Sequence, residues 1–138
     1  MTPAEPRVTQ PNLVALGCAG LRECRIIVCG GRQYADRERV FAVLDMLHVE
    51  CIIALVIHGG APGADRLAAD WAMLRVVPIA AYIAQWNRDG RAAGPIRNQL
   101  MLNEAKPSLV VAFLGGRGTA DLVKRARLAG VKVIEVLP

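Results

Sequence analysis

The sequence predicts an α/β protein with a Rossmann-like, doubly wound sheet of five parallel strands, arranged as three α/β/α layers. Strand-like and helix-like segments alternate five times along the chain, and this alternation is typical of parallel βαβ units. The strand-like runs are apolar throughout instead of alternating with polar residues, which indicates strands covered on both faces. Because crossovers between parallel strands are right-handed, they wind helices onto both faces of one sheet.

The predicted strands are short, apolar and rich in β-branched residues. They span residues 25–29, 51–58, 76–83, 108–114 and 131–136. Pro78 lies inside the third run, and a proline cannot donate a hydrogen bond to a strand ladder. We therefore expect the third strand at an edge of the sheet.

Four helices are predicted between these strands. The first begins after Asp36, which is suited to cap it, and the others span about 63–75, 95–105 and 119–129. Apolar faces are formed by Val40, Phe41, Leu44 and Leu47 in the first helix and by Leu67, Trp71 and Leu74 in the second. Residues 86–94 are polar and contain glycine, so we expect a loop before the third helix.

The length of 138 residues predicts a single folded domain, which we place at 23–138. Residues 1–22 contain three prolines and no clear period, so we expect a partly disordered N-terminal arm. No apolar run reaches the roughly 18 residues of a membrane span, and the first residues lack a secretory signal pattern. We therefore expect a cytoplasmic protein that does not enter a membrane.

The formal net charge of +5 indicates an anionic partner, either a nucleic acid or a phosphorylated small molecule. The basic residues are not gathered into one run, which argues against a nucleic-acid-binding tail. The cysteines are Cys18, Cys24, Cys29 and Cys51. None of them forms a C-x-x-C pair, and no histidine stands at zinc-ligand spacing. No metal site is expected.

Three of the predicted strands are followed by paired glycines, Gly30-Gly31, Gly59-Gly60 and Gly115-Gly116. Parallel strands place these pairs at one edge of the sheet, where ligands of this architecture bind. Glycine lets a ligand approach the backbone closely, and successive amides with a helix N-terminus attract phosphate. Each pair could instead be only a tight turn. None of the three loops matches G-x-G-x-x-G or the P-loop with its lysine.

The candidate binding residues surround these loops. They are Gly30, Gly31, Arg32, Gly59, Gly60, Ala61, Gly63, Asp65, Arg91, Arg97, Asn98, Gly115, Gly116, Arg117, Gly118 and Thr119. Arginine is suited to phosphate because its guanidinium pairs with two oxygens at once; Arg88 is a further candidate. Arg97 falls in the first turn of the third predicted helix, where the helix dipole disfavours a cation. We therefore expect an anionic partner for it.

Several polar and aromatic residues near the loops allow two interpretations. Asp65 and Asp121 either begin helices or accept hydrogen bonds from ribose hydroxyls. Thr119 either caps its helix or donates to phosphate, and Asn98 could donate to a base or sugar. His58 is expected as a buried structural residue. Trp86 and Tyr34 could stack a base, whereas Trp71 is expected in the core.

Four segments of the chain carry a family resemblance. They are G-G-R-Q-Y-A-D at 30–36, H-G-G-A-P-G-A-D at 58–65, W-N-R-D-G-R-A-A-G-P-I-R-N at 86–98 and L-G-G-R-G-T-A-D at 114–121. In this order they resemble the YspA/YpsA-related branch of the SLOG superfamily, named for its Smf/DprA and LOG members. The resemblance spans 25–136 and implies a Rossmann-like domain that binds a nucleotide-derived ligand, such as AMP, ADP-ribose or an NAD-related compound, without a required cofactor.

The resemblance also implies alternatives to a ligand-sensing domain. LOG members hydrolyse the N-glycosidic bond of nucleoside monophosphates and often form dimers, so a homodimer or higher oligomer is expected. Asp65, Arg97 and Asp121 are then the candidate catalytic residues, although Leu122 occupies the position of the LOG glutamate. Smf/DprA members bind single-stranded DNA. Few aromatic residues are available here to stack on its bases, so the small nucleotide ligand is the favoured partner.

Overall fold

The computed structural model describes residues 23–138 and confirms the predicted fold class. In chain order the elements are β1 (Glu23–Cys29), α1 (Arg37–Glu50), β2 (Ile52–His58), α2 (Ala64–Arg75), β3 (Ile79–Ala81), α3 (Trp86–Asp89), η2 (Gly90–Ala92), α4 (Ala93–Ala105), β4 (Leu109–Ala112), α5 (Arg117–Leu128) and β5 (Lys132–Glu135). The predicted arm at 1–22, and Cys18 within it, lie outside the described residues.

The sheet has the order β3-β2-β1-β4-β5, and every neighbouring pair of strands is parallel. The chain runs outward from β1 to β3, then crosses over to β4 and continues to β5. The strand order therefore reverses between β1 and β4. In open parallel sheets, ligands bind outside the carboxyl ends of the strands at such a reversal.

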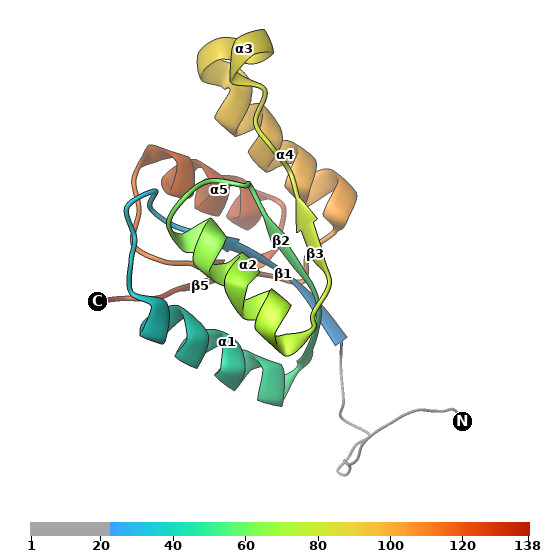
Figure 1. Cartoon of the computed structure of the whole chain (residues 1–138). Coiled ribbons are helices and arrows are strands. Elements are labelled where there is room, and N and C mark those ends of the chain that lie inside the picture. The colour runs from blue at the N-terminus through green and yellow to red at the C-terminus, as the bar shows by residue number, and fades with distance from the viewer. Residues whose placement is uncertain (1–22) are drawn as a thin grey trace.

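Helices cover both faces of the sheet, as Figure 1 shows. One apolar cluster joins one face of the sheet to α1 and α2, and its members include Val40, Leu44 and Trp71. A second cluster joins the other face to α4 and α5 through Met101, Leu122 and Ala126. Since β1 and β4 contribute residues to both clusters, their continuous apolar sequences are explained by burial on both sides.

Local sequence accounts for most element boundaries. The Asp36 side chain accepts a hydrogen bond from the Arg39 amide at 3.0 Å and so caps α1 as predicted. β3 is an edge strand, which agrees with Pro78 just before it. Pro107 follows α4, which ends at Ala105 as expected. Within the described residues, no helix has both the length and the apolarity that crossing a bilayer requires.

Two predictions about the helices are wrong. Residues 86–94 form not a loop but α3, η2 and the first turn of α4. The Gln85 carbonyl accepts from two amides, those of Arg88 and Asp89, and thereby closes a helical turn that Gly90 interrupts with φ of +59°. In α2 the buried side runs through Ala64, Ala68, Trp71 and Ala72. Leu74 lies off this side and is 59% exposed.

The backbone at Val76, the residue after α2, suggests a test of local strain. Val76 has φ of +59° and is 89% exposed, and β-branched residues rarely adopt this left-handed conformation. We expect Val76→Gly to raise the free energy of unfolding by about 1 kcal/mol, because glycine adopts positive φ without steric strain. Urea denaturation measures the change.

Val49 gives the matched control, because it is also exposed but lies inside α1. Val49→Gly should lower the free energy of unfolding by about 0.5 kcal/mol, since glycine disfavours a helix. A stability loss of equal size in both variants would contradict the strain at Val76.

Candidate functional site

A cavity of about 710 Å³ opens at the carboxyl ends of β1 and β2, between them and the first turns of α4 and α5. Of the candidate residues, its lining includes Gly30, Gly31, Arg32, Gly59, Ala61, Asp65, Arg91, Arg97, Asn98, Gly116, Arg117, Gly118, Thr119 and Asp121. Gly60, Gly63 and Gly115 do not line it. The cavity therefore lies at the reversal of strand order, where ligands of this fold bind.

The three glycine loops are in direct contact. The Gly31 amide donates to the Leu114 carbonyl at 2.8 Å, which joins the loop after β1 to the loop after β4. The Gly31 carbonyl accepts from the Ala64 amide at 3.2 Å, which joins the first loop to the start of α2. Packing is so close that a Cβ on Gly30 would lie 2.6 Å from the Cβ of Ala64. The expected convergence of the three turns therefore exists in the structure.

The loop after β2 is held by two side chains. Asp65 Oδ2 accepts from the Gly59 amide at 2.8 Å and from the Ala61 amide at 3.3 Å. His58 Nδ1 accepts from the Gly60 amide at 2.9 Å. These amides, and that of Gly31, are thus bonded within the protein and are not available to a ligand. The expectation that amides of all three turns face an anion is corrected here.

The N-terminus of α2 is also covered by the loop after β1. Gly63, its N-cap, has φ of +83° and packs against the backbone of Gly31 and Arg32. The Ala64 amide donates to Gly31, and the carboxylate of Asp65 fills the first turn. The carboxylate in this first turn disfavours a second anion at this helix end.

The α5 N-terminus, in contrast, is open. Its first helical bond runs from the Ala120 amide to the Gly116 carbonyl, and no side chain caps it. Within residues 23–138, the first-turn amides of Arg117, Gly118 and Thr119 therefore have no acceptor. A Cβ built on Gly118 would meet nothing within 4 Å. Unpaired amides and the positive end of the helix dipole make this turn an anion-binding position.

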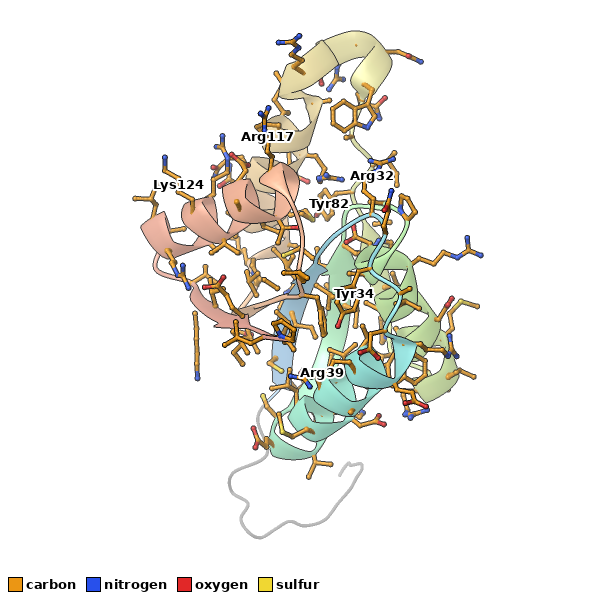
Figure 2. All side chains as sticks on the ribbon, turned by 90° about the vertical axis from the view of Figure 1, so that its left-hand side faces the viewer. Arg32, Tyr34, Arg39, Tyr82, Arg117 and Lys124 are labelled. Carbon is orange, nitrogen blue, oxygen red and sulfur yellow. The ribbon has the colours of Figure 1, made fainter. Side chains whose placement is uncertain are left out.

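Three exposed arginines share the cavity with this helix end. Arg32, Arg91 and Arg117 line the cavity, and their guanidinium groups form no hydrogen bond or ion pair with other described residues. Figure 2 shows Arg32 on the loop after β1 and Arg117 at the start of α5, at the same end of the molecule. Arg88 differs, because it pairs with Asp89 at 2.9 Å and does not line the cavity.

Arg97 plays a structural part in the site. Its Nη1 donates to the carbonyls of Gly59 at 2.6 Å and Tyr82 at 3.4 Å, and its Nε donates to Asn98 Oδ1 at 3.0 Å. Burial lowers the pKa of its guanidinium. Arg97 is the fifth residue of α4. We expected an anionic partner for Arg97 near the helix N-terminus. In the structure its guanidinium instead bonds to oxygens of Gly59, Tyr82 and Asn98.

Asn98 and Asp121 are also engaged. Asn98 is 3% exposed, and its Nδ2 donates to the Gly118 carbonyl at 3.2 Å and to Asp121 Oδ2 at 3.0 Å. Arg125 donates to the same Asp121 oxygen at 2.9 Å. Asn98 thus links α4 to the first turn of α5 and has no free donor for a base. Asp121 lies at the edge of the cavity as part of this network.

Burial shifts the pKa values of the two titratable groups that hold the β2 loop. Burial raises the pKa of the Asp65 carboxyl, and this effect outweighs the hydrogen bonds from the Gly59 and Ala61 amides, which lower the pKa. It lowers the pKa of His58, whose Nδ1 accepts from an amide and is therefore unprotonated. Both groups serve the loop, as expected for His58.

The remaining lining residues were not singled out by sequence patterns. They are Val28, Cys29, Gln33, Trp86, Gly94, Pro95, Met101 and Leu122; of these, Trp86 was expected near the site as an aromatic residue, and Leu122 was noted only as the position of the LOG glutamate. Gly94 and Pro95 belong to the motif at 86–98, which could have identified them. Tyr34 instead packs its ring 5.3 Å from that of Phe113 and does not line the cavity.

A second hollow of about 620 Å³ lies between α5, β5 and the C-terminal residues. Its lining includes Leu114, Leu128 and Leu137, and its one arginine, Arg127, is paired with Glu135 at 2.8 Å. Lys124 lies on this side of α5. The first cavity is therefore the better candidate for an anionic ligand. Among the described residues no cluster of three or more His, Cys, Asp or Glu could hold a metal ion.

Comparison with known proteins shows similarity to a protein family and to a phage protein. The model of the YspA, cpYpsA-related SLOG family matches residues 24–88, which include the first two glycine loops. The Gene 61 protein of Mycobacterium phage D29 is 36% identical over 119 residues, a match that covers 80% of this chain and 94% of the phage protein. No solved structure matches the chain.

The contact between Gly59 and Arg97 can be tested by adding one methyl group. A Cβ on Gly59 would collide with Arg97 Nη1 and lie 2.6 Å from Arg97 Cζ. We expect Gly59→Ala to displace the guanidinium and lower the free energy of unfolding by about 1–3 kcal/mol, because its carbonyl acceptors lose their donor. Gly118→Ala is the control, since that position is open and helical; it should leave stability unchanged or raise it by about 0.5 kcal/mol. Equal losses would contradict the assigned contact.

The lowered pKa of His58 predicts a loss of stability in acid. The unfolded chain binds the proton first, near the ordinary pKa of 6.5, whereas the folded chain resists it. Stability is therefore fully present above pH 6.5 and declines as pH falls below it. His58→Asn keeps an acceptor for the Gly60 amide but cannot titrate. Its melting temperature should fall less between pH 7 and about pH 5 than that of the parent; identical pH profiles would refute this role of His58.

Proposed function

Because the chain belongs to the YspA, cpYpsA-related SLOG family, we propose that its cavity binds a nucleotide or nucleotide-derived ligand, with a phosphate at the N-terminus of α5. The family suggests a role in binding or processing nucleotide-related ligands. One observation carries the position of the phosphate. The first-turn amides of α5 are unpaired within the described chain and face the same cavity as three unpaired arginines.

The charge balance of the cavity supports an anionic ligand. Four arginines line it, at positions 32, 91, 97 and 117, against two aspartates, Asp65 and Asp121. Both aspartates already accept hydrogen bonds from protein donors. Arg32, Arg91 and Arg117 are exposed and can reorient toward phosphate oxygens. A net positive field at an open helix N-terminus favours phosphate over a neutral ligand.

The size of the cavity supports a ligand larger than phosphate. Its volume of about 710 Å³ falls within the roughly 300–1,000 Å³ of small-molecule sites. A nucleoside monophosphate such as AMP fits this range, and ADP-ribose or an NAD-related compound can extend through the open mouth. We propose this nucleotide derivative as the partner of a ligand-sensing or ligand-processing domain.

Binding is better supported than cleavage of an N-glycosidic bond. Such cleavage needs a carboxylate near the oxocarbenium-like centre. The position of the LOG glutamate is Leu122, which is 1% exposed and packs in the core. Asp65 holds the loop after β2, and Asp121 is bonded to Asn98 and Arg125. Of the candidate catalytic residues, Arg97 binds backbone carbonyls.

Thermal unfolding in the presence of ligands tests the proposal. Saturating AMP or ADP-ribose should raise the melting temperature, by roughly 10 °C at 100 times the dissociation constant, because a ligand that binds only the folded state stabilises it. Arg117→Ala should weaken AMP binding by about 10-fold to 100-fold through loss of a charge-assisted contact.

Arg88→Ala is the control for that variant, because it removes the same charge from a residue that does not line the cavity. It should bind AMP like the parent. No stabilisation by any nucleotide at millimolar concentration, or equal losses in the Arg88 and Arg117 variants, would refute the proposed site.

A further inference from the structure

Trp86 occupies an unusual position for a large aromatic residue. It is the first residue of α3, and its side chain is 52% exposed. None of the four residues of α3 is buried. In Figure 1, α3 projects from the rest of the fold at the far end of α4. The indole therefore contributes little to the core, whereas the other tryptophan, Trp71, is fully buried and donates to Asp45.

The indole nevertheless lines the cavity. Trp86 shares its lining with Arg91 from η2, with Gly94 and Pro95 from α4 and with the first turn of α5. A Cβ on Gly94 would lie 3.4 Å from Trp86 Cη2, so the ring rests beside a residue that has no side chain. The edge of the ring therefore lies against α4 at Gly94.

The other large apolar side chains of the lining offer a ligand almost no surface, and the half-buried Ala61 and Pro95 are small. Val28 is 0%, Leu122 1% and Met101 2% exposed, so they form a closed floor beneath the cavity. Cys29 is 7% exposed. An apolar ring that enters the cavity therefore has one large, accessible apolar surface to contact among the described lining residues, the indole of Trp86.

We infer that Trp86 is a base-stacking platform, and that the ligand is a nucleotide held by its base on the indole and by its phosphate at the start of α5. This inference rests on the proposed function and narrows it. A sugar phosphate without a base would satisfy the helix N-terminus and the arginines but would leave the indole exposed. Stacking between an aromatic side chain and a base contributes about 1–3 kcal/mol and tolerates any base.

Gln33 lies in the same lining, on the loop after β1, and is exposed. Its amide supplies the lining with both a donor and an acceptor, the groups that pair with the polar edge of a base. The platform therefore distinguishes nucleotides from sugar phosphates.

Calorimetric titration with four nucleoside monophosphates (AMP, GMP, CMP and UMP) and with ribose 5-phosphate tests the inference. The parent should bind at least one nucleotide about 5-fold to 150-fold more tightly than ribose 5-phosphate, which is the stacking contribution expressed as an affinity ratio. Trp86→Ala should remove this ratio and leave the affinity for ribose 5-phosphate unchanged. Trp86→Phe should retain most of it, because a phenyl ring also stacks.

Ile96→Ala provides the matched control, since Ile96 is a 40% exposed apolar residue of α4 outside the cavity lining. It should bind all five compounds like the parent. Nucleotide binding should also quench indole fluorescence in the parent and not in Trp86→Phe, where only the buried Trp71 remains. Circular dichroism verifies that each variant is folded.

The outcomes separate the two proposals. If ribose 5-phosphate binds as tightly as every nucleotide, or if Trp86→Ala weakens both classes equally, the stacking platform is refuted while the phosphate site stands. If neither class binds the parent, the proposed function fails, and the inference fails with it.

Discussion

The candidate site depends on the hydrogen bonds formed by the backbone N–H and C=O of Gly31. Its amide donates to the Leu114 carbonyl, 83 residues away, and its carbonyl accepts from the amides of Ala64 and Tyr34. One residue thus joins the loops after β1 and β4 and the start of α2. A Cβ on Gly31 would lie 3.0 Å from the Leu114 carbonyl oxygen, so glycine permits this close approach. These bonds hold together the segments at the carboxyl ends of the strands, where the cavity lies.

The N-termini of α2 and α5 differ in this arrangement, because the amides around the first are bonded within the protein and those of the second are not. The amides around α2 are satisfied by Gly31, Asp65 and His58, and burial of their polar groups requires such partners. The amides of α5 are left unpaired within the described chain. An unsatisfied helix end next to a cavity is stable when it faces solvent or an anion. Within the described chain, the α5 N-terminus is therefore the one of these two whose first-turn amides remain free.

A polar network in α4 maintains this geometry from the opposite wall. Arg97 binds the Gly59 carbonyl of the β2 loop and Asn98, and Asn98 binds the Gly118 carbonyl of α5. The two sides of the cavity are thus connected through adjacent residues of one helix. Since Asn98 is buried, losing any member leaves polar groups without partners. The motif at 86–98 therefore serves both walls, with Trp86 and Arg91 at the mouth and Arg97 and Asn98 beneath.

Local patterns in the sequence determined the elements and their order. Continuous apolar runs predicted parallel strands, Asp36 predicted the start of α1, Pro78 predicted an edge strand, and the glycine pairs predicted the loops that converge. These features depend on the conformational preferences of neighbouring residues, which the sequence displays directly.

The tertiary structure decided which of the candidate groups are available. Gly31 and Leu114, and Arg97 and Gly59, are 83 and 38 residues apart, so no local pattern reveals that their hydrogen-bonding groups are already paired. The same reason explains why Arg97 and Asn98 bond to protein groups, why Tyr34 packs on Phe113, and why Trp86 remains exposed. A residue type states which bonds a group can form, but only the fold determines whether a protein partner forms them first.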